Sequence, residues 1–267
     1  MTQRVRTQAL KLVFALSPAT EKSTEIKHEF STIKFQPRTG SIDSFEALSM
    51  LVGTMKALAI DTTFIEKERP VSVETLLKRV RRAGRWGHVE TLELDFQYGV
   101  AANFDHCLVL VREKVPGIAH EWEFWAKPFI GLDGFIQGWV ADVDYDYWQN
   151  ATDPIQYKAA GRDFSHLSMK QNGSPPPLDQ MEIDTSHDPG RWELRDGYVE
   201  AVASLMWLSE LFWRRVGQVH KARLLSTTGV NVRDYMDGVI EVKASEHCFN
   251  SVETKDAQDR LRASLYG

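Results

Sequence analysis

The chain has 267 residues, of which 43% are hydrophobic and 26% are charged, and its formal net charge is −5. This composition excludes a disordered polymer and suffices for one large domain or two modest ones. The acidic total argues against direct nucleic-acid binding, because phosphate contacts need accumulated lysine and arginine. No apolar run approaches the roughly 20 residues that span a bilayer, so no membrane association is expected.

The N-terminal residues predict a strand rather than a signal peptide. Arg4, Arg6 and Lys11 accompany a short apolar run, but the lysine interrupts it and no convincing cleavage site follows. Alternate positions are apolar, which predicts a strand that buries one face. The residues on that face are Leu10, Leu12, Phe14 and Leu16. Residues 29–35 predict a second strand.

Two amphipathic helices are expected next. Asp43 predicts the N-cap of the first helix, whose apolar residues recur at spacings of three and four up to residue 59. Ser72 begins the second helix and Gly84 ends it. The outer face and exit of the second helix are basic, at Lys78, Arg79, Arg81, Arg82 and Arg85. A solvated helix face accounts for these charges better than a site for an acidic partner.

The remaining elements come in mixed order. Residues 89–98 alternate and predict one half-buried strand, residues 108–111 predict a central strand, and RWELR predicts a short strand. An apolar helix over 198–216, capped by Asp196, a strand over 239–244 and a helix from residue 255 are expected. This order predicts an α+β fold with mostly antiparallel sheet.

We expect a single domain over residues 1–267, with the Pro-rich loop 172–179 as a candidate sub-boundary. Each half places strands around one long helix, which leaves open two structurally related halves, although no residue-level repeat is present. The aromatic content also leaves a homodimer open.

Residues 131–157 are acidic and aromatic and contain no lysine or arginine. In an extended chain, Asp142, Asp144 and Asp146 would point from one face. Such a row suits a strongly basic partner, and we predict that it forms the partner-binding site together with three aromatic residues. These residues are Tyr145, Tyr147 and Trp148. The alternative is a solvated acidic loop beside a packed aromatic cluster. An exposed row would tolerate replacement of all three aspartates by lysine without loss of the fold.

One segment suggests an enzyme instead. Glu241 and Lys243 form a Glu-x-Lys pattern like that of metal-dependent, restriction-endonuclease-like nucleases, in which the acid holds a cation and the lysine stabilises charge on the phosphate. That chemistry also needs a second acid, and only Asp234 and Asp237 lie near in sequence.

Other metal and catalytic patterns are incomplete. The calcium-loop spacing that starts at Asp142 has Tyr147 where glycine is needed. The pairs His106–Cys107 and His247–Cys248 can each offer only one zinc ligand from a strand. We therefore expect no catalytic residues, metal or cofactor. With only two cysteines there is no disulfide framework, which favours a reducing cytoplasm.

The segments GFIQGWVADVDYDYWQNATDP and PGRWELRDGYVEAV, together with the overall length, resemble the immunity protein 52 family of bacterial polymorphic toxin systems. The resemblance implies a cytoplasmic, non-enzymatic antidote. It would bind and block a cognate nuclease (DNase) toxin delivered by a contact-dependent secretion system such as type VI secretion. The family supplies no catalytic residues to carry over.

Overall fold

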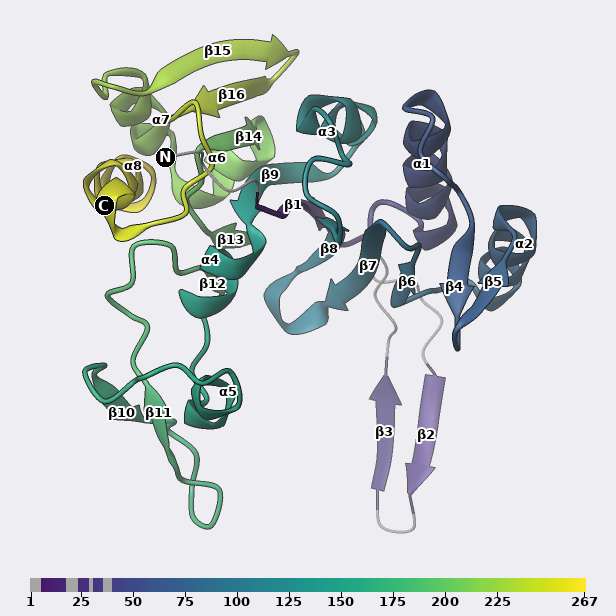
Figure 1. The fold of residues 1–267 in the computed structure, drawn as a ribbon, viewed down its shortest axis with the longest axis horizontal. Coiled ribbons are helices and arrows are strands. Elements are labelled where there is room, and N and C mark those ends of the chain that lie inside the picture. The colour runs from purple at the N-terminus through teal and green to yellow at the C-terminus, as the bar shows by residue number, and fades with distance from the viewer. Residues whose placement is uncertain (1–5, 18–23, 29–30, 36–39) are drawn as a thin grey trace.

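The computed structural model describes residues 6–17, 24–28, 31–35 and 40–267, and its central element is a ten-stranded antiparallel sheet (Figure 1). In spatial order the strands are β15 (Asn231–Met236), β16 (Val239–Lys243), β14 (Leu205–Ser209), β9 (Phe135–Asp142), β1 (Gln8–Ala15), β8 (His106–Glu113), β7 (Leu94–Ala101), β6 (His88–Glu90), β4 (Phe64–Glu66) and β5 (Arg69–Val71). The predicted α+β class with a mostly antiparallel sheet is confirmed.

β1 occupies the middle of this sheet, between β8 and β9. Leu10, Leu12 and Phe14 are fully buried on one face, as the alternation predicted, and Leu16 follows them in a bridge to Gly40. Leu12 lies opposite Gly138 of β9, where an added Cβ would approach the Leu12 side chain to 2.8 Å. The glycine therefore leaves room for the Leu12 side chain beside β9.

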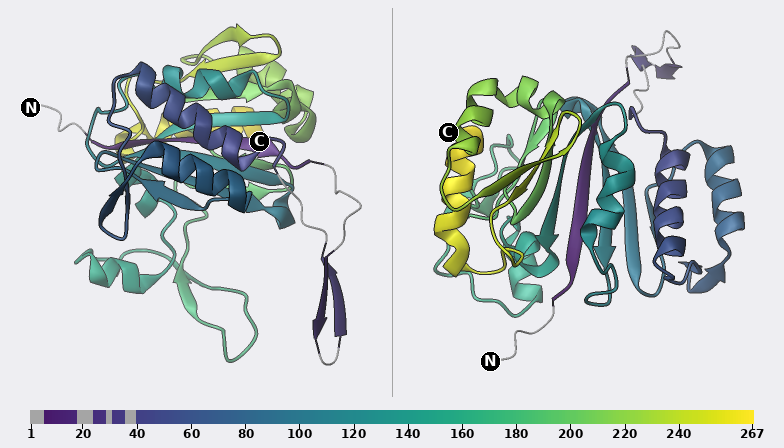
Figure 2. Two further views of the ribbon diagram at one scale, coloured as in Figure 1. Left: turned by 90° about the vertical axis from the view of Figure 1, so that its right-hand side faces the viewer. Right: turned by 90° about the horizontal axis from the view of Figure 1, so that it is seen from above.

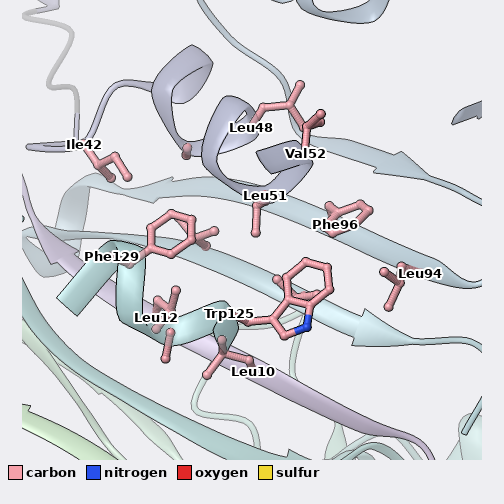
Figure 3. Close-up of a cluster of buried hydrophobic side chains, with 14 of the residues drawn as sticks. Leu10, Leu12, Ile42, Leu48, Leu51, Val52, Leu94, Phe96, Trp125 and Phe129 are labelled. Carbon is pink, nitrogen blue, oxygen red and sulfur yellow. The ribbon is translucent and has the colours of Figure 1, made fainter. Parts of the chain in front are cut away.

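Helices cover both faces of the sheet (Figure 2). One group is α1 (Ser44–Ala57), α2 (Val73–Ala83) and α3 (Trp122–Ile130), and the other is α6 (Glu210–Val216), α7 (Gln218–Leu225) and α8 (Lys255–Tyr266). Each group packs over its own buried cluster. Figure 3 shows Leu51 of α1 and Trp125 of α3 in one cluster with Leu10 of β1 and Phe96 of β7. None of the helices in the described residues combines the length and apolar character needed to cross a membrane.

Local signals for the helices in the first half are confirmed. The Asp43 carboxylate accepts the Phe45 and Glu46 N–H groups at 2.8 and 3.2 Å and so caps α1. Ser72 caps α2, and Gly84 ends it with a φ of +66°, a value that favours glycine. The expected helix from residue 255 is α8, and the expected strand at 239–244 is β16. Residues 29–30 of the expected second strand lie outside the described residues, and the rest is β3 (Ser31–Phe35), paired with β2 (Thr24–His28).

The prediction of one strand over residues 89–98 is wrong. The chain forms β6 and β7 with a tight turn between them, because the Thr91 hydroxyl accepts the N–H groups of Glu93 and Leu94 at 3.2 and 3.0 Å. Leu92, which alternation placed in the core, is at the turn and 72% exposed. The predicted central strand at 108–111 is confirmed as part of β8.

The long helix predicted over residues 198–216 with Asp196 as its cap is also wrong. The segment forms β13 (Tyr198–Glu200), β14 and then α6, whose N-cap is Ser209. RWELR supplies β12 (Glu193–Arg195), which pairs with β13 across a turn at Gly197. A central strand buried on both faces is as continuously apolar as a buried helix, so periodicity alone does not separate them.

Between β9 and β12 the chain leaves the sheet and forms the appended segment seen below it in Figure 1. This segment comprises α4 (Val143–Trp148), α5 (Pro154–Ala159), β10 (Met169–Gln171) and β11 (Met181–Ile183). It has a small core of its own around Ala151, Tyr157 and Ile183. The Pro-rich loop 172–179 connects the paired strands β10 and β11. The remaining short elements are the 3-10 turns Ala102–Phe104 and Val252–Thr254.

Candidate partner-binding site

The predicted acidic row over residues 142–146 is not an extended segment. Asp142 ends β9 and caps α4, and its carboxylate accepts the Tyr145 N–H at 2.8 Å. Asp144 and Asp146 lie in the first turn, where the helix dipole favours negative charge. The geometry of the prediction is therefore wrong, because a capping aspartate followed by two acidic residues begins a helix here instead of continuing a strand.

Asp142 is a structural residue. Only 2% of its side chain is exposed, and its carboxylate lies 2.9 Å from the Arg6 guanidinium. Burial raises the pKa of this carboxyl, although the Tyr145 N–H and Arg6 act in the opposite direction. It cannot contribute directly to an exposed acidic surface.

Asp144 and Asp146 are also paired, but to different degrees. Asp146 lies 2.7 Å from the ammonium group of Lys11, and both side chains are largely covered. The Lys11 ammonium also lies over the rings of Trp139 and Trp192, at 5.7 and 5.1 Å from their centroids. Asp144 pairs with Arg6 at 2.8 Å, yet 61% of its side chain remains exposed. Two basic side chains thus offset most of the charge of the three aspartates.

The three predicted aromatic residues differ in burial, because Tyr145 and Trp148 are partly buried and Tyr147 is exposed. Tyr145 is partly buried, packs against the cluster beneath α6–α8, and accepts a 2.9 Å hydrogen bond from Gln258. Tyr147 is 47% exposed and meets the edge of Trp148 at a centroid distance of 4.9 Å. Trp148 donates its indole N–H to Asp144 at 3.0 Å. Asp144 and Tyr147 are the exposed residues of the predicted site, and together with the partly buried Trp148 they form what we call the α4 surface.

The α4 surface is rigidly supported. Tyr157 packs edge-on against Trp148 at 4.7 Å and donates its hydroxyl to the Trp148 carbonyl at 3.2 Å. The Arg162 guanidinium lies 4.3 Å from the Trp148 ring centre. In the sequence, Arg6 and Lys11 are features of a signal-like N-terminus only. Their pairing with α4 is not predictable from it, because the contacts join positions more than 130 residues apart.

Glu241, the centre of the alternative nuclease site, forms an ion pair within the sheet. Glu241 is 6% exposed and makes a bidentate ion pair with Arg233 of β15, at 2.7 and 2.9 Å. Lys243 pairs with Glu246 at 2.7 Å. Arg233 lies opposite Glu241, so its neighbour Asp234 points from the other face of the sheet. The second acid that nuclease chemistry needs is therefore not beside Glu241 on this strand pair.

No metal centre is evident in the described part of the chain, where no three His, Cys, Asp or Glu side chains come close enough to share an ion. Cys107 and Cys248 are both free. Burial raises the pKa of each thiol to about 12, so both remain protonated at neutral pH. Comparison with protein-family models, with characterised proteins and with solved structures finds no significant match for this chain.

Proposed function

We propose that this chain is a cytoplasmic immunity protein that binds a secreted nuclease toxin and blocks it, protecting the cell that makes both proteins. The α4 surface would be the contact for the toxin. The observation that carries the proposal is the exposed carboxylate of Asp144 held directly beside the exposed ring of Tyr147 and the fixed indole of Trp148.

This combination suits an inhibitor of a nucleic-acid enzyme. A nuclease must present a basic surface to bind its substrate. A fixed carboxylate steers such a surface during encounter, and a supported aromatic pair supplies buried contact area once the two proteins dock. Because Arg6 and Lys11 offset part of the local charge, we expect aromatic burial to contribute more to affinity than charge does.

The proposal predicts that a secreted nuclease is encoded beside this chain, and co-expression of the two proteins tests it. Cells that die from the nuclease alone should survive when the parent protein is present, and the two proteins should copurify. The double variant Asp144→Lys/Tyr147→Ala should weaken the complex by about 30-fold to 1,000-fold, since it reverses one charge and removes one aromatic anchor. Its melting temperature should stay close to that of the parent, because both side chains are exposed.

Asp234→Lys is the matched control, because Asp234 is also an exposed aspartate but lies on β15. It should protect as well as the parent does. A folded double variant that still protects would exclude the α4 surface as the contact. Failure of the parent itself to protect or copurify would exclude the proposed function.

A further inference from the structure

His106, the first residue of β8, is a fully buried histidine that lies outside both the α4 surface and the Glu-x-Lys segment. Its neighbour Cys107 belongs to the core under α1–α3. The His106 ring therefore points from the opposite face of the sheet, on which the β12–β13 hairpin and α6 lie. A histidine that is buried in this way needs hydrogen-bond partners inside the protein.

The hydrogen bond of the imidazole fixes its tautomer. Nδ1 lies 2.8 Å from the Phe104 carbonyl oxygen, and because that oxygen can only accept, Nδ1 carries the proton and donates it. In the neutral ring Nε2 is then an acceptor. Nε2 is buried and has no hydrogen-bond partner among the residues that the structure describes. An imidazolium would bury a second N–H group there without an acceptor, so this place favours the neutral ring.

The Phe104 carbonyl also fastens the β12–β13 hairpin. It accepts the Gly197 N–H at 2.6 Å, and the Gly197 carbonyl accepts a hydrogen bond from Arg215 of α6. An added Cβ at Gly197 would approach the Arg215 guanidinium to 2.6 Å, so the turn packs closely against α6. One carbonyl oxygen thus joins the imidazole to the hairpin turn.

Three charged side chains act on the imidazole from the elements around it. Arg215 comes from α6, Asp196 from the hairpin turn, and Asp105 from the residue before β8. Burial lowers the pKa of His106 and Arg215 acts in the same direction, whereas the Phe104 carbonyl and the two aspartates oppose them. Arg215 and Asp105 lie 3.7 Å apart, so their effects on the ring partly offset each other.

We propose that His106 is an acid-sensitive latch, whose protonation releases the β12–β13 turn from the connection between β7 and β8. The second N–H group of the imidazolium needs water, and water reaches the ring when the Gly197 N–H leaves the Phe104 carbonyl and the turn moves away. Gln137 still holds β13 through Val199, so the opening is confined to the turn. This latch does not depend on the function proposed above.

The pH dependence of the latch has a defined direction. Above the ordinary histidine pKa of about 6.5, the ring is neutral in the open and the closed form, and the closed form has its full stability. Below that pH the open form binds a proton that the closed form excludes. The open population therefore rises as the pH falls, by up to about 10-fold per pH unit, until the pH reaches the lowered pKa of the closed form.

Amide hydrogen exchange of the full chain tests the latch. Exchange is followed by NMR and corrected for the intrinsic rate at each pH. The Gly197 amide reports opening of the turn, and the Leu12 amide, at the centre of the sheet, reports global unfolding. We expect the opening constant at Gly197 to rise about 10-fold from about pH 7.5 to about pH 5, with Gly197 less protected than Leu12 throughout.

His106→Asn keeps an N–H group that can reach the Phe104 carbonyl but removes the titrating ring. In this variant the pH dependence at Gly197 should fall below about 2-fold. His120→Asn is the matched control, because His120 is exposed just before α3 and has a φ of +59°, which asparagine tolerates. It should keep the parental pH dependence.

An NMR titration of the His106 ring in the parent protein gives a second measurement that needs no variant. A ring that titrates below its ordinary pKa supports the latch, and one that titrates at or above it contradicts the latch. Parental pH dependence in a folded His106→Asn protein would overturn the latch as well. Equal protection of Gly197 and Leu12 in the parent would also overturn it, because the turn would then open only when the whole sheet unfolds.

Discussion

Asp142, Asp144 and Asp146 show how residues of one type, two positions apart, acquire different roles. Sequence alternation makes them equivalent, and the structure makes one a buried helix cap, one a partner of Lys11 and one an exposed surface group. Residue identity and local spacing could predict only that the segment is acidic and aromatic. They could not predict burial, because the cations that permit it come from β1 and the residues before it.

The cap role makes Asp142 costly to replace. Asp142→Ala removes the acceptor for the Tyr145 N–H and leaves the mostly covered Arg6 without the buried carboxylate that its guanidinium contacts at 2.9 Å. We expect the free energy of unfolding to fall by about 1–3 kcal/mol, measured by urea denaturation. Asp144→Ala should change it by less than about 0.5 kcal/mol, because that carboxylate is exposed. Equal losses for both variants would contradict the distinction.

These ion pairs also argue against the expectation that the fold would survive replacement of all three aspartates by lysine. A lysine at position 142 would place a cation against Arg6 in a buried site, and a lysine at 146 would face Lys11. Such a triple variant would lose binding by losing its fold, and so could not test the interface. Asp144 is the position at which loss of binding can be measured without loss of the fold.

Among the elements, those with an unambiguous local signal were predictable. The Asp43 and Ser72 caps, the Gly84 stop and the alternation in β1 are decided by neighbours within a few residues. The segments whose secondary structure was predicted wrongly depend on the elements that pack over them. Within residues 198–216, Leu205–Leu208 is continuously apolar because β14 is buried between two layers, and periodicity does not distinguish that from a buried helix.

The Gln137 amide holds the β12–β13 hairpin over β9, while Arg215 and the Phe104 carbonyl bind its turn at Gly197. The Gln137 contact gives a sharp prediction. Gln137→Met keeps the volume but leaves the Val199 N–H and carbonyl without the amide partners that they have in the native structure. We expect a loss of about 2–4 kcal/mol in unfolding free energy. Hydrogen exchange at the Val199 amide should become faster as well.

Gln97→Met is the matched control, since Gln97 is a partly exposed glutamine on β7 whose long 3.5 Å contact to Asp95 is marginal. It should cost well under 1 kcal/mol. Unchanged Val199 exchange in Gln137→Met would show that the hairpin is held by its apolar contacts instead.

At the scale of the whole molecule, β1 joins the two layers. Its side chains Leu10, Leu12 and Phe14 belong to the core under α1–α3, and Val13 belongs to the core under α6–α8. β1 thus contributes side chains to both cores, and the single domain over residues 1–267 stays a prediction. The sheet supports the appended segment, which carries the α4 surface, from one side.

Leu12→Ala tests whether both sides of the sheet unfold as one unit. It opens a void in the middle of the sheet, where Gly138 has no side chain to fill it, and should cost about 2–5 kcal/mol. Urea unfolding should remain one transition, and hydrogen exchange should accelerate in β7 and in β16 together. Leu92→Ala, at a turn exposed to solvent, should be nearly neutral. Acceleration on only one side of β1 would indicate two independent units.

The central place of β1 also has a consequence during protein synthesis. β1 is made before both of its neighbours, which end at residues 113 and 142. Until those strands leave the ribosome, an apolar strand with two open edges has no native partner, and such segments are prone to aggregate or to engage chaperones. Close to half of the chain must therefore be translated before its first strand is sheltered.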